Sequence, residues 1–396
     1  MHRKTSIFVA IILVCQLCLL VWSGGGAREA GGTGLRPVRR GASADPQAGL
    51  GSKEEIFQTP PSPAPPPVPE PAPPPPPAPI RGIYATAYSA GSAERFARIL
   101  EFIRRTEVNA LVVDVKDDTG TISYESAVPL ARAIGAGRRK FRPEEILAAL
   151  AAENIYPIAR IVVFKDPYLA ERRPDLAVKS RSTGGLWRDR KGLAWVDPHN
   201  REVWRYVVDI AKEAAAKGFR EIQFDYVRFT SDGNLADCVY PHADGRKRYE
   251  VIRDFLLFAR AELKPLGVVV SADVFGLTCS AQDDLGIGQV IEEIAKAVDI
   301  ISPMVYPSHY YPGTYGLPDP DAAPYETVVR SLRDALARLG GTEVRLRPWL
   351  QDFSLRHRYG RAELMAQIKA VYDAGLDEWL FWNPSNVYDA GKYNRE

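Results

Sequence analysis

The sequence predicts an α/β protein built as a (β/α)8 barrel, preceded by a signal or anchor segment and a disordered proline-rich linker. Of its 32 prolines, fourteen fall between Pro60 and Pro79, which separates a low-complexity tail from a globular part that begins at Arg81. Within that part, strand-like apolar runs alternate eight times with helix-period stretches. Such alternation indicates a parallel sheet covered by helices, and eight repeats in about 300 residues suit a closed barrel.

Residues 1–27 are expected to form a signal peptide or an uncleaved signal anchor. Two cations precede Thr5, an apolar run extends from Ile7 to Trp22, and small residues close the segment. These are the three regions of a secretory signal, and the apolar run is short for a membrane span. The chain is therefore expected outside the cytoplasm, secreted or tethered to the outer face of the membrane through this segment alone.

Residues 28–80 are expected to be a disordered Gly/Pro-rich linker. Their composition offers too few apolar side chains for a core. The proline tract should extend as polyproline II by about 3 Å per residue. We expect it to act as a spacer, and recognition of the tract by a partner protein is the alternative.

Residues 81–390 are expected to form the barrel. The strand candidates are Gly82–Tyr88, Ala110–Lys116, Tyr156–Phe164, Glu221–Phe229, Val268–Phe275, Asp299–Tyr306, Val344–Gln351 and Glu378–Asn383. The helix candidates are Ala93–Arg105, Pro143–Glu153, Arg201–Lys217, Lys247–Leu263, Gln289–Ala297, Tyr325–Leu339 and Arg361–Ala374. A doubly wound open sheet is the alternative, but the first strand is not followed by the glycine-rich phosphate loop typical of that fold.

Side-chain parity along the strands predicts which residues enter the lumen. In the fourth strand candidate, Ile222 and Phe224 are apolar and belong against helices, so Asp225 points inward. The same reading of the fifth candidate points Asp273 inward. Both carboxylates come late in their strands, at the face where barrel enzymes keep their active sites.

Other polar and aromatic side chains are expected at the same mouth. The candidate substrate-binding residues are Asp114, Lys116, Arg160, Arg228, Tyr306, His309, Arg347, Trp349, Gln351 and Asn383. Each also has a purely structural interpretation. The arginines at 160 and 347 are candidates to neutralise the two aspartates, the aspartates at 117 and 118 to lie in a solvated loop, and the tryptophans at 379 and 382 to belong to the core.

Several kinds of chemistry find no support in the sequence. A net charge of +2 argues against nucleic acid as a partner. The five histidines lack metal-binding spacing, and neither a P-loop nor a G-x-S-x-G motif occurs, so we expect no metal and no cofactor. We expect a monomer. Whether Cys238 and Cys279 form a disulfide is left open by the sequence.

A carboxylate pair with aromatic side chains in an exported protein indicates glycoside hydrolysis. Asp225 would attack the sugar or activate water, and Asp273 would protonate the leaving oxygen. Two alternatives remain. The first is a non-catalytic carbohydrate-binding barrel at the cell surface. The second is a lyase or esterase that acts on acidic glycans, with Lys116, Arg160 and Arg347 binding carboxylates.

Six blocks, in order, resemble a bacterial family of proposed glycosidases that was formerly catalogued as a domain of unknown function. They are Arg81–Tyr84, Asp114–Gly120, Ala159–Asp166, Phe224–Phe229, Ser302–Tyr310 and Trp349–Phe353. The resemblance extends from about Arg81 to Tyr388 and implies a barrel of the (β/α)8 glycosidase superfamily. It supports Asp225, because several barrel glycosidases carry a catalytic aspartate at the end of the fourth strand. Amylase-like relatives usually have Glu where Asp273 stands, so the identity of the acid is left open.

Overall fold

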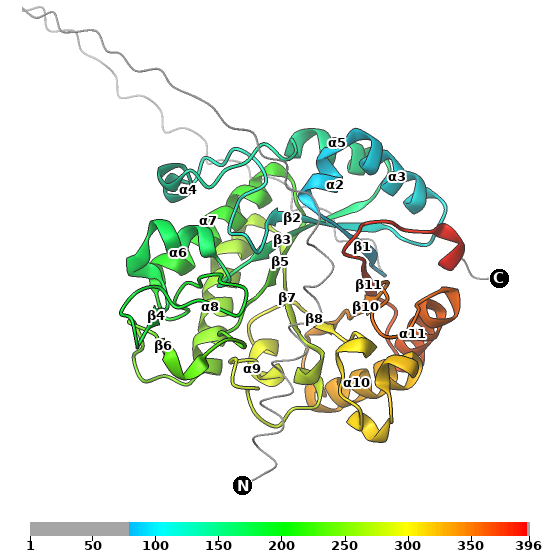
Figure 1. Cartoon of the computed structure of the whole chain (residues 1–396). Helices are drawn as coiled ribbons and strands as arrows, with labels where there is room; N and C mark the ends of the chain where they lie inside the picture. Colours follow the sequence, from blue (N-terminus) through cyan, green and yellow to red (C-terminus); the bar gives the residue numbers. More distant parts are fainter. Residues whose placement is uncertain (1–78, 394–396) are drawn as a thin grey trace, which may run out of the picture. The chain divides into compact units, whose positions relative to one another are not determined.

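The computed structural model describes residues 79–393, which form a closed (β/α)8 barrel (Figure 1). The predicted signal segment 1–27 and residues 28–78 of the predicted linker lie outside the described residues. Parallel pairing runs around the sheet and closes where β1 pairs with β11. The predicted fold class is therefore confirmed.

Eight strand positions make up the barrel within the described chain. They are occupied by β1 (Arg81–Ala85), β2 (Ala110–Lys116), β3 (Tyr156–Val162), β5 (Glu221–Asp225), β7 (Val269–Phe275), β8 (Ile300–Met304), β9 (Arg345–Leu346) together with β10 (Trp349–Gln351), and β11 (Trp379–Trp382). All but β1 lie inside a predicted run, and β1 begins one residue before its run. Several strands end earlier than predicted because the chain turns into the loops at the barrel mouth.

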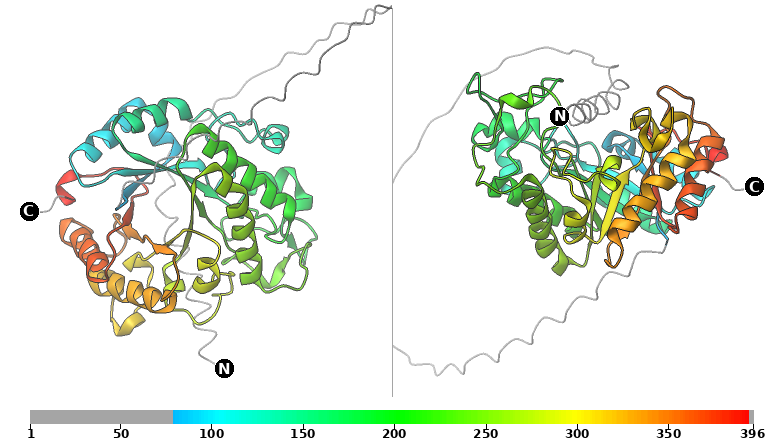
Figure 2. Two further views of the ribbon diagram at one scale, coloured as in Figure 1. Left: turned by 180° about the vertical axis from the view of Figure 1, so that it is seen from behind. Right: turned by 90° about the horizontal axis from the view of Figure 1, so that it is seen from below.

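The helices lie outside the strands (Figures 1 and 2). The longer ones are α3 (Ala93–Arg104), α5 (Pro143–Ala152), α7 (Arg201–Lys217), α8 (Arg248–Leu263), α10 (Pro324–Leu339) and α11 (Arg361–Asp373), and the short ones are α2 (Ala87–Gly91), α4 (Pro129–Ile134), α6 (Pro167–Arg172) and α9 (Ile291–Ala295). Local signals fix their ends: Asn200 caps the start of α7 with its side chain, and Gly218 ends that helix in the left-handed conformation.

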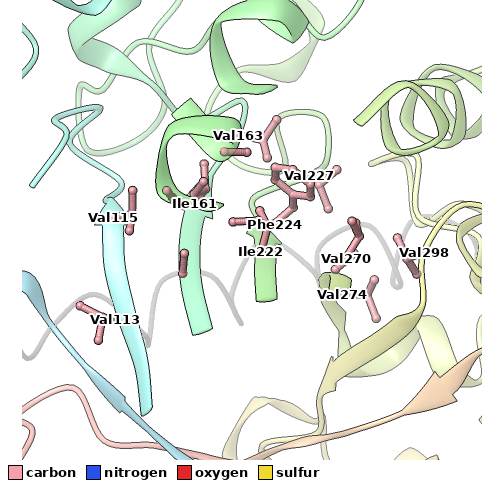
Figure 3. Close-up of a cluster of buried hydrophobic side chains, with 14 of the residues drawn as sticks. Val113, Val115, Ile161, Val163, Ile222, Phe224, Val227, Val270, Val274 and Val298 are labelled. Carbon is pink, nitrogen blue, oxygen red and sulfur yellow. The ribbon is translucent and has the colours of Figure 1, made fainter. Parts of the chain in front are cut away.

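Two layers of side chains follow from strand parity. The outward-facing residues pack between strands and helices in one large apolar core, part of which Figure 3 shows with Ile222, Phe224, Val270 and Val274. The inward-facing apolar residues form a separate cluster that includes Tyr84, Tyr306 and Trp349. The predicted parity of the strands at 221 and 269 is therefore confirmed.

The seventh strand position is interrupted. β9 pairs with β8 at Leu346, and β10 pairs with β8 again at Trp349. Between them stands Pro348, which has no N–H to donate to the ladder. The sequence predicted one continuous strand over Val344–Gln351, and the proline explains why it appears as two short pieces.

Two long loops at the mouth are joined to each other. The connection after β3 contributes β4 (Lys179–Ser180), and the connection after β5 contributes β6 (Cys238–Val239), which pair antiparallel. Cys238, in this ribbon, and the buried Cys279 are both free thiols. Within residues 79–393, no helix is long and apolar enough to cross a membrane.

Candidate active site

The two predicted catalytic aspartates lie side by side at the C-terminal ends of adjacent strands. β5 and β7 pair in register, with Phe224 beside Ala272. Asp225 and Asp273 are the next residues, and both side chains are almost fully buried. Parallel strands are about 4.8 Å apart, so neighbouring inward side chains at one level are within reach of one substrate bond.

Arg160 of β3 neutralises Asp225 and connects it to Asp114. Its guanidinium donates from Nε and Nη2 to Oδ2 of Asp225, at 3.0 and 2.5 Å, and from Nη1 to Oδ1 of Asp114, at 2.6 Å. Burial raises the pKa of Asp114 to about 6, against the opposing effect of the arginine. The predicted neutralising role of Arg160 is thus visible in the structure.

A strained residue fixes the other oxygen of Asp225. Tyr226 directly after it adopts φ +50°, a left-handed conformation that is uncommon for a bulky residue. In this conformation its backbone N–H donates to Oδ1 of Asp225 at 2.6 Å. The carboxylate is therefore held through both oxygens. Oδ2 accepts two hydrogen bonds from Arg160 and Oδ1 accepts one, so Oδ1 retains a lone pair for a substrate or water.

Asp273 lies in a different environment. Burial, followed by the negative charge of Asp225, raises its pKa well above the ordinary aspartate value, although Arg160 and a hydrogen bond from Trp349 act in the opposite direction. The indole Nε1 of Trp349 donates to Oδ1 of Asp273 at 2.8 Å. A proton on Asp273 would therefore be carried by Oδ2, the oxygen that this bond leaves available.

Aromatic side chains line the lumen beside the carboxylates. Tyr84 and Trp382 stack with ring centroids 3.8 Å apart, and Trp349 meets Trp382 edge-on at 5.6 Å. The hydroxyl of Tyr84 donates to Asp114 at 2.5 Å. The sequence analysis did not select Tyr84 as a site residue, although the parity of its strand points the side chain inward. It assigned both Trp379 and Trp382 to the core. In the structure only Trp379 packs on the helix-facing side.

Tyr306 and His309 lie at the mouth with Phe353, which the sequence analysis missed. His309 meets the rings of Tyr306 and Phe353 edge-on, at 5.3 and 5.8 Å. Its Nδ1 is 2.9 Å from Oγ of Ser308, and burial lowers its pKa to about 3. His309 is therefore neutral at ordinary pH, which suits hydrogen bonding to hydroxyl groups more than proton transfer.

Arg347 is placed away from the mouth. It is fully buried and ion-paired with Glu221, the first residue of β5, which also accepts from Ser271 Oγ at 2.6 Å. This is the N-terminal end of the strand, whereas Asp225 is its last residue. Parity correctly turned Arg347 inward, but the predicted contact with substrate, and its proposed pairing with an active-site aspartate, are not what the structure shows.

Lys116 is also withdrawn from the mouth. Its side chain is fully buried, with Nζ 2.9 Å from Oδ2 of Asp166 and donating to the carbonyl of Val162 at 2.7 Å. A register shift between Asp114 and Lys116 accompanies this placement. Gly120 closes the loop above: a Cβ there would lie 2.0 Å from Oδ1 of Asp166. The lysine therefore fixes loops and does not contact substrate.

Gln351 and Asn383 support loops at the mouth. Gln351 accepts from the backbone N–H of Ser308 at 3.1 Å and donates to the carbonyl of Phe353 at 2.9 Å, so it holds the segment that carries Tyr306. Asn383 donates to Asp352 at 3.2 Å and to the carbonyl of Val387 at 2.8 Å. Both side chains therefore position loops at the mouth, and their substrate-binding roles stay predictions.

The loop after β2 is less solvated than predicted. Asp117 is buried and ion-paired with Lys140 at 2.5 Å, and Asp118 is ion-paired with Lys165 at 2.8 Å. Both aspartates therefore brace the loop. Within residues 79–393, no group of three or more His, Cys, Asp or Glu side chains could hold a metal ion.

Carboxylates and aromatic rings at the C-terminal mouth of a (β/α)8 barrel are the equipment of enzymes that hydrolyse glycosidic bonds. The fold and the site thus define the class. The chain belongs to the family described as "Putative glycosyl hydrolase domain", whose model matches residues 82–388. The match covers most of the chain, and the family expected from the six sequence blocks is confirmed.

Two solved structures, those of PgaB (BpsB) and TtGalA, agree on the fold. The glycoside hydrolase domain of PgaB (BpsB) from Bordetella bronchiseptica is 15% identical, with 79% of this chain and 97% of that chain covered and a TM-score of 0.59. The α-galactosidase TtGalA from Thermus thermophilus is 14% identical, with coverages of 79% and 60% and a TM-score of 0.50. A hypothetical protein from Ruminiclostridium thermocellum is 45% identical over 48% of this chain and 97% of its own, with a TM-score of 0.46. Comparison with curated proteins found no match.

Proposed function

We propose that this glycosyl hydrolase cleaves an extracellular or cell-wall polysaccharide with Asp225 and Asp273 as its carboxylate pair. The observation that carries the proposal is the contrast between two adjacent carboxylates. Asp225 is held against the cationic Arg160, whereas Asp273 is buried with a raised pKa. Environments that separate a pair of acids in this way assign one as the anionic partner and the other as the general acid.

The chemistry follows from the hydrogen bonds. Oδ2 of Asp273 gives its proton to the glycosidic oxygen while the bond from that oxygen to the anomeric carbon breaks. Asp225 either attacks that carbon or takes a proton from the attacking water. The stacked rings of Tyr84 and Trp382 border the same space, where aromatic faces pack against sugar rings. In the first route, water then cleaves the bond between Asp225 and the sugar and gives its proton to Asp273. In the second route, Asp225 releases the proton it took to solvent, and solvent returns one to Asp273.

The experiment is an assay for new reducing ends on a panel of wall polysaccharides and exopolysaccharides. Hydrolysis predicts their release by the wild-type protein. A carbohydrate-binding barrel would bind a polymer and release no product, and a lyase would yield an unsaturated product that absorbs in the near ultraviolet. We propose an extracytoplasmic location on the sequence of residues 1–27, with the proline tract as spacer.

We expect cleavage with retention of anomeric configuration. Adjacent strands separate the backbones of Asp225 and Asp273 by about 4.8 Å, close to the roughly 5 Å between the carboxyl groups of retaining enzymes and below the 6.5–9.5 Å of inverting ones. Proton NMR of the first-formed product measures the configuration. Appearance of the inverted anomer before mutarotation would show that the carboxyl groups act further apart than this register allows.

Trp349→Phe should move the alkaline limb of the pH–rate profile to higher pH. The indole N–H favours the anionic form of Asp273, so its removal raises the pKa of that acid further, and the acid remains protonated at higher pH. The profile of kcat/KM measures the shift. Trp379→Phe is the matched control, because Trp379 packs on the helix-facing side. An unmoved limb in Trp349→Phe would contradict the assignment of the acid.

A further inference from the structure

Arg228 is a buried cation for which the described protein provides no carboxylate. It is 5% exposed, and its two hydrogen bonds within residues 79–393 both leave from Nη1, to the carbonyl of Phe229 and to Oγ of Ser231, each at 3.0 Å. The other inward arginines differ: Arg160 is paired with aspartates and Arg347 with a glutamate. Burial of a charge without a counterion costs folding free energy, so the presence of Arg228 at this position requires an explanation.

Three aromatic rings hold the guanidinium in place. Its carbon lies 4.9 Å from the ring centroid of Trp195, 5.0 Å from that of Tyr226 and 4.9 Å from that of Phe275. Trp195 is itself fixed, because its indole donates to Asp189 at 3.2 Å. Cation–π contacts compensate part of the desolvation but leave the in-plane donors of an arginine unused.

The rings place Arg228 at the active site. Tyr226 follows Asp225 directly, and Phe275 stands two residues after Asp273, on the same side of β7. Within the described residues, some buried side-chain nitrogen and oxygen atoms lack a hydrogen-bond partner, but Nε and Nη2 of Arg228 do not belong to this group. Since Nη1 makes both of its hydrogen bonds, these two donors reach the surface of the mouth and form the fork that fits a carboxylate.

We infer that Arg228 binds the carboxylate of an acidic sugar, so that the substrate is a polysaccharide containing uronic acid or a similarly carboxylated residue. This inference rests on the proposed function and names its substrate class. The carboxylate would supply the counterion that Arg228 lacks. The rigid cage would lower the ordering cost of the bidentate contact, because the guanidinium is already held in position.

The test compares a glucuronate-containing polysaccharide with the same polymer after its carboxyl groups have been reduced to alcohols. Wild-type kcat/KM should be at least about 10-fold higher on the acidic polymer, in the range of one charge-assisted pair. Arg228→Gln should abolish this preference, mainly by raising KM on the acidic polymer. Arg228→Lys should retain part of the preference, because it keeps the charge without the fork.

The exposed Arg190 provides the matched control, since Arg190→Gln removes an equal charge from a neighbouring loop. It should leave the preference unchanged. Equal loss on both polymers in Arg228→Gln, or no preference in the wild type, would overturn the inference. If no polymer is cleaved, the proposed function fails, and calorimetric binding of glucuronate decides the role of Arg228 separately: binding lost in Arg228→Gln supports it, and no binding to the wild type overturns it.

Discussion

Asp225→Asn is expected to lower kcat by at least about 10³-fold, the scale seen when a catalytic nucleophile or base is removed. An amide can neither attack the anomeric carbon nor accept a proton from water. It is nearly the same size as the carboxylate, and its oxygen can still accept from Arg160, which also retains Asp114 as a partner. The fold should therefore persist, and a steady-state assay beside a thermal melt separates the two effects.

Asp352→Asn is the control for this substitution. Asp352 is a buried carboxylate near the same end of the barrel, bonded to Asn383 and Tyr393. Neutralising it should leave kcat within a few-fold of the wild type.

A further discriminating result is rescue of Asp225→Gly by azide, which would enter the vacated space and yield a glycosyl azide. Near-wild-type turnover of Asp225→Asn would remove that residue from the mechanism.

Arg347→Met is expected to lower the free energy of unfolding by about 3–5 kcal/mol, because it leaves Glu221 charged and unpaired in the lumen. Denaturant unfolding measures the loss. The double variant Arg347→Met/Glu221→Gln should recover most of it, since no isolated charge is then buried. The turnover of the folded single variant should stay near that of the wild type.

This experiment also decides between two roles for Arg347. The sequence analysis assigned Arg347 to substrate binding. In the structure Arg347 lies at the N-terminal end of the barrel strands, paired with Glu221. A variant with unchanged stability and a raised KM would restore the substrate-binding role. Loss of stability without a change in KM fits the ion pair.

The fold could be predicted because its signals are local. Each strand has a short apolar run, and each long helix has a 3.6-residue period with its own start and stop residues. Parity within a strand also correctly turned Asp225, Asp273 and Trp349 into the lumen. These inferences need no knowledge of neighbouring strands.

Partners across the lumen could not be predicted in the same way. Glu221 shares the inward parity of Asp225, but its pairing with Arg347 depends on closure of the barrel across 126 residues of sequence. The register shift that accompanies the burial of Lys116 is likewise a property of two paired strands. Trp382 lies beside Tyr84 only because the last strand returns to the first.

The closure of β11 onto β1 also fixes the end of the barrel at which the described chain enters. Ile80, just before β1, donates its N–H to Glu378 at 3.1 Å, so the described chain enters the barrel at the face opposite to the carboxylates. Closure of the barrel thus separates the end at which the described chain enters from the end at which the two carboxylates lie.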